Sequence, residues 1–144
     1  AQVNNNRAST GADRQNAFKK HEALIDKSPN KNLNWRLLGP DNTSGRATDV
    51  WGIEGNKNII YAGFATGGFW KTEDAGKTWQ PLMDKEATQA IGNFAVSKSN
   101  PNVIYVGTGE ANIFRASLPG VGMYKSGDAG KTWQHIGLEN TSTI

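Results

Sequence analysis

The sequence predicts an all-β chain in which four-stranded antiparallel sheets repeat along the polypeptide. Residues 70–80 read WKTEDAGKTWQ and residues 124–134 read YKSGDAGKTWQ, with eight of the eleven positions identical at an offset of 54. Residues 56–63 (NKNIIYAG) match residues 100–107 (NPNVIYVG) at an offset of 44, because the second copy carries a ten-residue insertion before Gly122. Repeats of about 40–55 residues with four short strands each are typical of the blades of a β-propeller.

The first 33 residues are predicted to form a largely irregular N-terminal extension. They carry six basic and three acidic side chains, whereas the other 111 residues carry ten of each, so the net charge of +3 lies in this extension. Residues 13–27 are its one helix-like stretch, with Phe18, Leu24 and Ile25 at loosely helical spacing. A charge of about +3 spread over this length is too dilute for a phosphate-neutralising stripe, so we expect no nucleic-acid partner.

After this extension the sequence predicts a lone outer strand and two blades. The outer strand is residues 34–38, and the blades are residues 47–82 and 91–137. Glycine and Asn/Asp/Pro clusters separate the strand segments, as hairpin turns require. The first blade is expected to have strands at residues 48–53, 59–64, 69–72 and 78–82. The second is expected to have strands at residues 91–97, 103–107, 121–126 and 132–136.

Two blades cannot close a ring, because each would leave an inner strand edge and an apolar face in water. Twelve residues separate Trp79 from Ile91, where the second blade begins, and twelve residues after Trp133 would be residue 145. We therefore expect the chain to be the N-terminal part of a larger propeller. Its required partner is the rest of its own propeller or another polypeptide that completes the ring. Residues 1–144 alone are expected to aggregate or to bury their blade edges against another polypeptide.

Each blade carries the motif S/T-x-D-x-G-x-T-W, an Asp-box, between its third and fourth strands. In such a turn the Asp accepts hydrogen bonds from amides, the Gly supplies a positive φ, and the Trp packs its indole beneath the loop. Two matches at the blade period indicate structural turns rather than catalytic acids. The residues are Thr72, Asp74, Gly76, Thr78 and Trp79 in the first blade and Ser126, Asp128, Gly130, Thr132 and Trp133 in the second.

Together with the Asp-boxes, three further segments carry a resemblance to a known superfamily. They are residues 38–46 (LGPDNTSGR), residues 61–63 with 67–71 (YAG and GGFWK) and residues 100–110 (NPNVIYVGTGE). Over about residues 34–144 the chain resembles bacterial secreted proteins of the sortilin-like, Asp-box (BNR-repeat) propeller superfamily. The resemblance implies a secreted or cell-surface location after removal of a signal peptide. It does not imply one activity, because many functions share this scaffold.

The resemblance extends to sialidases, xyloglucan-cleaving hydrolases and photosystem assembly factors with Asp-boxes. Sialidases need an arginine cluster, a tyrosine nucleophile and an Arg-Ile-Pro segment, where this chain has Gly45-Arg46-Ala47. Xyloglucan hydrolases carry an acidic residue before a Gly-Gly-aromatic run, where this chain has Thr66, which cannot act as a carboxylate acid or base. We therefore expect a binding module for a polypeptide or a glycan that is non-catalytic in this segment. An Asp-box glycoside hydrolase, sialidase-like or xyloglucanase-like, is the alternative.

The ligand face of a propeller is built by the loops that join second to third strands and fourth to next first strands. Here these loops are residues 41–46, 65–67, 84–90 and 108–119. The predicted ligand-binding residues are Arg46, Glu110, Asn112, Phe114 and Arg115, and Glu110 is also the catalytic candidate of the alternative. A structural role for Arg46 and Glu110, as an ion pair between blades or as loop hydrogen-bonding residues, stays open.

The sequence lacks the residues that several other functions and kinds of site require. The chain has no cysteine, so it can form no disulfide and no thiolate metal site. His21 and His135 lie 114 positions apart, and we expect no metal and no cofactor. Glycines interrupt the longest apolar stretch, residues 59–70, so we expect no membrane insertion. Tyr61 and Tyr105, at equivalent positions, are expected in core or inter-blade packing, and His135 is expected at the surface.

Overall fold

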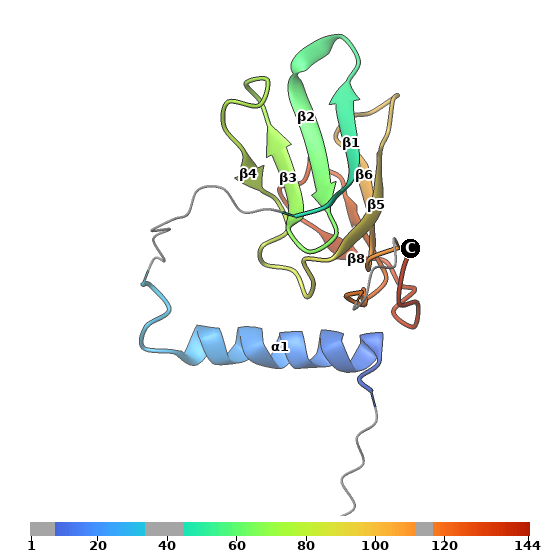
Figure 1. The fold of residues 1–144 in the computed structure, drawn as a ribbon. Helices are drawn as coiled ribbons and strands as arrows, with labels where there is room; N and C mark the ends of the chain where they lie inside the picture. Colours follow the sequence, from blue (N-terminus) through green and yellow to red (C-terminus); the bar gives the residue numbers. More distant parts are fainter. Residues whose placement is uncertain (1–7, 34–44, 112–116) are drawn as a thin grey trace, which may run out of the picture.

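The structure, a computed structural model, describes residues 8–33, 45–111 and 117–144. The predicted outer strand at residues 34–38 and the candidate binding residues Asn112, Phe114 and Arg115 lie outside the described residues. Along the described chain, one helix is followed by two four-stranded sheets with strand orders β1-β2-β3-β4 and β5-β6-β7-β8 (Figure 1). All pairings are antiparallel. The predicted all-β fold of consecutive four-stranded propeller blades is confirmed.

The strands follow the predicted segments closely except at the outer edge of each sheet. The first sheet contains β1 (Ala47–Ile53), β2 (Asn56–Phe64), β3 (Gly68–Thr72) and β4 (Gln80–Pro81). The second contains β5 (Ile91–Val96), β6 (Ile104–Thr108), β7 (Met123–Ser126) and β8 (Gln134–His135). The fourth strands are shorter than predicted because the backbone amides of Thr78 and Thr132 donate to the Asp-box carboxylates instead of a strand partner.

The core lies between the two sheets, where β5 contacts β1 and β2. The Phe69 ring meets the Phe94 ring edge-on at 4.7 Å between centroids and the Trp133 ring at 5.8 Å. Gly63 on β2 allows a close approach of β5, because a Cβ there would lie 2.9 Å from Cγ2 of Ile91. The buried apolar residues are Tyr61, Phe69, Met83, Ile91, Phe94, Val96, Ile104, Val106, Val121 and Tyr124.

The helix α1 (Gly11–Lys27) begins two residues before the predicted range and crosses one end of the sheets (Figure 1). A capping box starts it, because the Asp13 amide donates to the Thr10 hydroxyl and the Thr10 amide donates to the Asp13 carboxylate. Leu24 and Ile25, part of the loose helical spacing in the sequence, remain 67% and 46% exposed. The helix therefore docks through its N-terminal half rather than through an apolar stripe.

Candidate functional site

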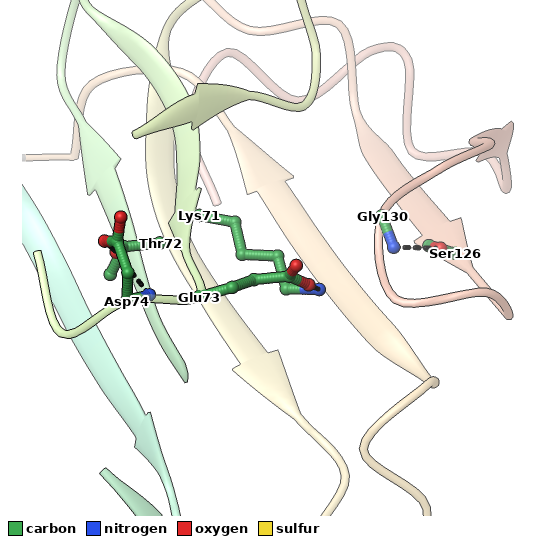
Figure 2. A network of polar contacts seen from close by, with 6 residues as sticks. All are labelled: Lys71, Thr72, Glu73, Asp74, Ser126 and Gly130. Atoms are coloured by element: carbon green, nitrogen blue, oxygen red, sulfur yellow. Dashed lines mark hydrogen bonds and ion pairs between the residues drawn. The ribbon is translucent and has the colours of Figure 1, made fainter. Parts of the chain in front are cut away.

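The two Asp-box turns are built by the same set of hydrogen bonds. Figure 2 shows one bond of each turn, from the Asp74 amide to the Thr72 hydroxyl and from the Gly130 amide to the Ser126 hydroxyl. In the first, the Thr72 hydroxyl donates to Asp74 at 2.8 Å, and the amide and hydroxyl of Thr78 donate to the same carboxylate at 2.9 and 2.6 Å. In the second, Ser126, Asp128 and Thr132 reproduce these distances. Gly76 and Gly130 close the turns with φ of 90° and 89°.

The electrostatics of these carboxylates fit a structural role. Hydrogen bonds from Thr78, first from its side chain and then from its backbone, lower the pKa of Asp74 to about 2. Hydrogen bonds from Thr132 lower the pKa of Asp128 to about 2 in the same way. A carboxylate that is ionised and already accepting several hydrogen bonds is a poor proton donor near neutral pH.

The tryptophans of the two motifs differ in their surroundings. The indole of Trp133 donates to the main-chain oxygen of Leu82 at 2.8 Å, which ties the second sheet to the first. Trp79, at the equivalent position, is 40% exposed. Trp133 therefore joins two described blades, whereas no described blade precedes the blade of Trp79.

Arg46 and Glu110 meet at the end of the sheets that α1 crosses. Arg46 directly precedes β1, Glu110 follows β6, and their side chains form an ion pair. The Arg46 side chain is 39% exposed and that of Glu110 only 6%. Removing the cation would leave a buried charge uncompensated. The geometry therefore favours the structural role that the sequence left open, a pair that joins the two blades.

Thr108 anchors the base of the inserted loop that follows β6. Its hydroxyl donates to the Gly122 carbonyl at 2.6 Å and accepts from the Val121 amide at 2.8 Å. The Glu110 amide adds a bond to the Leu118 carbonyl at 3.0 Å. Both stems of the loop that carries Asn112, Phe114 and Arg115 are thus fixed to the sheet.

The helix α1 docks on this loop end, which the sequence analysis missed. The Arg14 guanidinium donates to the Gly120 carbonyl, and the Gln15 amide donates to the Tyr124 hydroxyl at 2.8 Å. Burial, with the charge of Glu22 as a smaller contribution, raises the pKa of Glu86 to about 7. The capping box T-x-x-D at Thr10 was the sequence signal that could have located the start of the helix.

A groove of about 660 Å³ lies between the β4–β5 loop and the second Asp-box turn. Leu82 and the ring of Trp133 contribute its apolar surface, while Asp84, Lys85 and Lys131 contribute charge. Mixed aromatic and charged linings of this kind suit a polar ligand with an apolar face. Its Asp84–Glu86 side belongs to the predicted loop at residues 84–90.

Tyr61, Tyr105 and His135 are the other residues for which the sequence predicts a position. Tyr61 is buried, and this burial raises the pKa of its phenol, which therefore stays protonated. Tyr105 is 37% exposed, so the described residues do not bury it, and its packing against another blade stays a prediction. His135 is half-buried on the outer strand β8. Its ring lies 2.7 Å from the Val121 carbonyl and edge-on to Tyr124.

Two kinds of feature are absent from the described residues. Within residues 8–33, 45–111 and 117–144, no group of three or more His, Asp or Glu side chains is placed to hold a metal ion. In the same ranges no helix combines the length and the apolar character needed to cross a bilayer.

Comparisons with known proteins bear on the fold. No protein-family model and no curated protein matches the chain. Among solved structures it is similar to an ancestral GH74 enzyme, with 21% identity over 69% of this chain and a TM-score of 0.52. It also matches a GH74 enzyme of Niastella koreensis, with 24% identity over 59% of this chain and a TM-score of 0.42. The chain spans 13% of the length of each, and the first match shows a shared fold.

Proposed function

We propose that this chain belongs to a secreted or cell-surface β-propeller of the sortilin-like, Asp-box type that binds a polypeptide or a glycan. Binding uses the loops at the end of the sheets that α1 crosses, and these two blades carry out no catalytic step. The inserted loop contributes two ligand contacts, Phe114 and Arg115, which lie outside the described residues.

The observation that carries this proposal is the state of Glu110, the one catalytic candidate of the sequence, and of the two Asp-box carboxylates. Glu110 is buried against the Arg46 cation, and Asp74 and Asp128 are ionised and bonded within their turns. Glycoside hydrolysis needs two carboxyl groups that face one bond, one of them able to donate a proton. Thr66, in the exposed turn between β2 and β3, supplies neither.

Two features support binding by the loop end. The described stems of the inserted loop are held by hydrogen bonds from Thr108 and Glu110, so the loop has a fixed base. The groove beside Trp133 adds a second surface, of which the β4–β5 loop forms one side and the second Asp-box turn the other. Aromatic and guanidinium side chains on rigid loops are common anchors in recognition.

The alternative is an Asp-box glycoside hydrolase in which Glu110 is one of the two carboxyl groups. Its burial favours this function, since buried titratable groups gather at functional sites. The natural polypeptide should therefore be screened both for binding on glycan and protein panels and for hydrolysis of sialosides and polysaccharides.

Three variants and one control variant separate the two functions. For binding, Phe114→Ala and Arg115→Ala should weaken capture by about tenfold or more. Lys98→Ala, in the loop between β5 and β6 at the opposite end, should leave capture unchanged. Turnover of any panel member that Glu110→Gln abolishes, with the unfolding temperature of the variant preserved, would refute the binding proposal and establish the hydrolase.

A further inference from the structure

The helix α1 occupies the same end of the sheets that the proposed function assigns to ligand binding (Figure 1). The Arg14 guanidinium donates to the Gly120 carbonyl at the base of the inserted loop, and the Gln15 amide donates to the Tyr124 hydroxyl at 2.8 Å. Arg14 and Gln15 are half-buried, whereas all of residues 19–27 are exposed. The contact is therefore confined to the N-terminal half of the helix.

Gly11 shows how closely this half of the helix approaches the loop end. It is the buried residue of α1, and a Cβ there would overlap the carbonyl oxygen of Glu139, which follows β8. Backbone packs directly on backbone at this point, which requires the absence of a side chain. A methyl group at residue 11 would therefore separate α1 from its docking surface, and neither residue lies in a strand of the two sheets.

The helix is held by few contacts. None of the buried apolar residues of the described core comes from α1. The Nε atom of Arg14 is buried and has no hydrogen-bond partner among the described residues, and an unsatisfied buried donor costs free energy. Glu22 brings a like charge to Glu86 in the β4–β5 loop, and this charge is, after burial, the second cause of the raised pKa of Glu86. The helix can therefore leave the sheets without opening the core.

The surface beneath the helix presents hydrogen-bond acceptors, namely the Gly120 carbonyl and the Tyr124 hydroxyl. Beside them, a cavity of about 330 Å³ remains between α1 and the sheet, with His135 on β8 and Glu139 after it in the lining. Acceptors of this kind suit the guanidinium of an arginine and a side-chain amide, the two groups that α1 supplies. The surface thus fits a helical polypeptide better than a glycan.

We propose that α1 is a displaceable occupant of the ligand-binding end, and that the surface beneath its N-terminal half receives a second polypeptide helix with an arginine followed by a side-chain amide. The inference rests on the proposed function and selects the polypeptide from its two ligand classes. A segment of the same chain competes at a high effective concentration, so α1 blocks capture until a tighter ligand displaces it.

Gly11→Ala tests the docking, because its methyl group would overlap Glu139 although alanine favours the helix itself. Gly52→Ala is the matched control, since a Cβ there meets nothing within 4 Å. In the protein, Gly11→Ala should speed amide hydrogen exchange of residues 11–27 by at least about tenfold and leave β6 unchanged, because an isolated helix of this length is marginal in water. Arg14→Ala, which adds no bulk, should act in the same direction. Unchanged exchange of α1 in both variants would overturn the proposal.

The probe for the vacated surface is a fluorescently labelled synthetic peptide of residues 8–27. Fluorescence anisotropy should show that it binds the Gly11→Ala protein at least about tenfold more tightly than the unsubstituted protein or Gly52→Ala, whose own helix competes. The same peptide with Arg14→Ala should bind at least about tenfold more weakly, because it cannot donate to the Gly120 carbonyl. Equal binding to all three proteins, or no binding to the Gly11→Ala protein, would overturn the proposal.

The ligand panels separate this inference from the proposed function. A polypeptide captured by the protein should be captured at least about threefold better by the Gly11→Ala protein, and the peptide of residues 8–27 should compete with it. Capture that neither the variant nor the peptide changes would refute displacement and leave the binding function intact. Capture of glycans alone would overturn the choice of a polypeptide. Peptide binding without capture of any panel member would support the surface and refute the proposed function alone.

Discussion

Tyr61 and Tyr105 offer a matched test of how the blades are stabilised, because the same residue occupies equivalent strand positions with different burial. Tyr61 is 1% exposed and stacks on Phe69 at 5.8 Å between ring centroids. Truncating a buried aromatic residue to alanine costs about 3–5 kcal/mol through lost transfer free energy and the cavity left behind. Tyr105 is 37% exposed, so its truncation should cost about 1 kcal/mol or less.

The assay is urea unfolding of the protein, followed by tryptophan fluorescence. With an m-value of about 2 kcal/mol/M, Tyr61→Ala should lower the midpoint by about 2 M and Tyr105→Ala by about 0.5 M or less. Equal losses for the two variants would refute the reasoning, because Tyr105 would then be covered in this chain as well.

Three further predictions concern packing and titration. Gly63→Ala should destabilise by about 1–3 kcal/mol, because the new Cβ would lie 2.9 Å from Ile91, whereas Gly52→Ala, with nothing within 4 Å, should change the free energy of unfolding by less than about 0.5 kcal/mol. The pKa of Glu86 is raised from 4.5 to about 7, so the folded state binds more protons than the unfolded state between these pH values. The free energy of unfolding should therefore fall as the pH rises through this window. Thermal melts as a function of pH should show this fall, and Glu86→Gln should remove it. The pKa of Asp128 is lowered from 3.8 to about 2, so its contribution to the free energy of unfolding should be complete above about pH 4 and lost as the pH falls toward 2. Asp128→Asn should therefore reduce the loss of stability in this pH range. An unchanged midpoint of acid unfolding would contradict the turn geometry.

The fold was predictable from the sequence because it is local and repeated. The Asp-box bonds join residues two to four positions apart, so the motif itself specifies the turn between third and fourth strands. The glycine and Asn/Pro clusters likewise mark hairpins within one sheet. The errors in strand length arose where the same local bonds compete with strand pairing at Thr78 and Thr132.

The candidate site was less predictable because its contacts join distant parts of the chain. Arg14 and Gln15 reach partners 106 and 109 residues away, and nothing in the composition of α1 indicates that docking. Arg46 and Glu110 were identified as candidates, but the sequence could not decide between a ligand site and an ion pair. The decision depends on how closely the ends of two neighbouring sheets approach, which no local pattern encodes.

Contacts between the blades join non-equivalent positions of successive repeats at Trp133 with Leu82 and at Ile91 with Gly63. Each repeat therefore has one surface that reaches backward and another that receives the next repeat. Such a chain buries its middle surfaces and leaves one surface of each kind at its two ends. Trp79 lies on the backward surface of the first sheet, and Tyr105 lies on the forward surface of the second. Both are exposed because these are the two unpaired end surfaces. Neither exposure by itself indicates a ligand site, and covering both requires further repeats or a partner that imitates them.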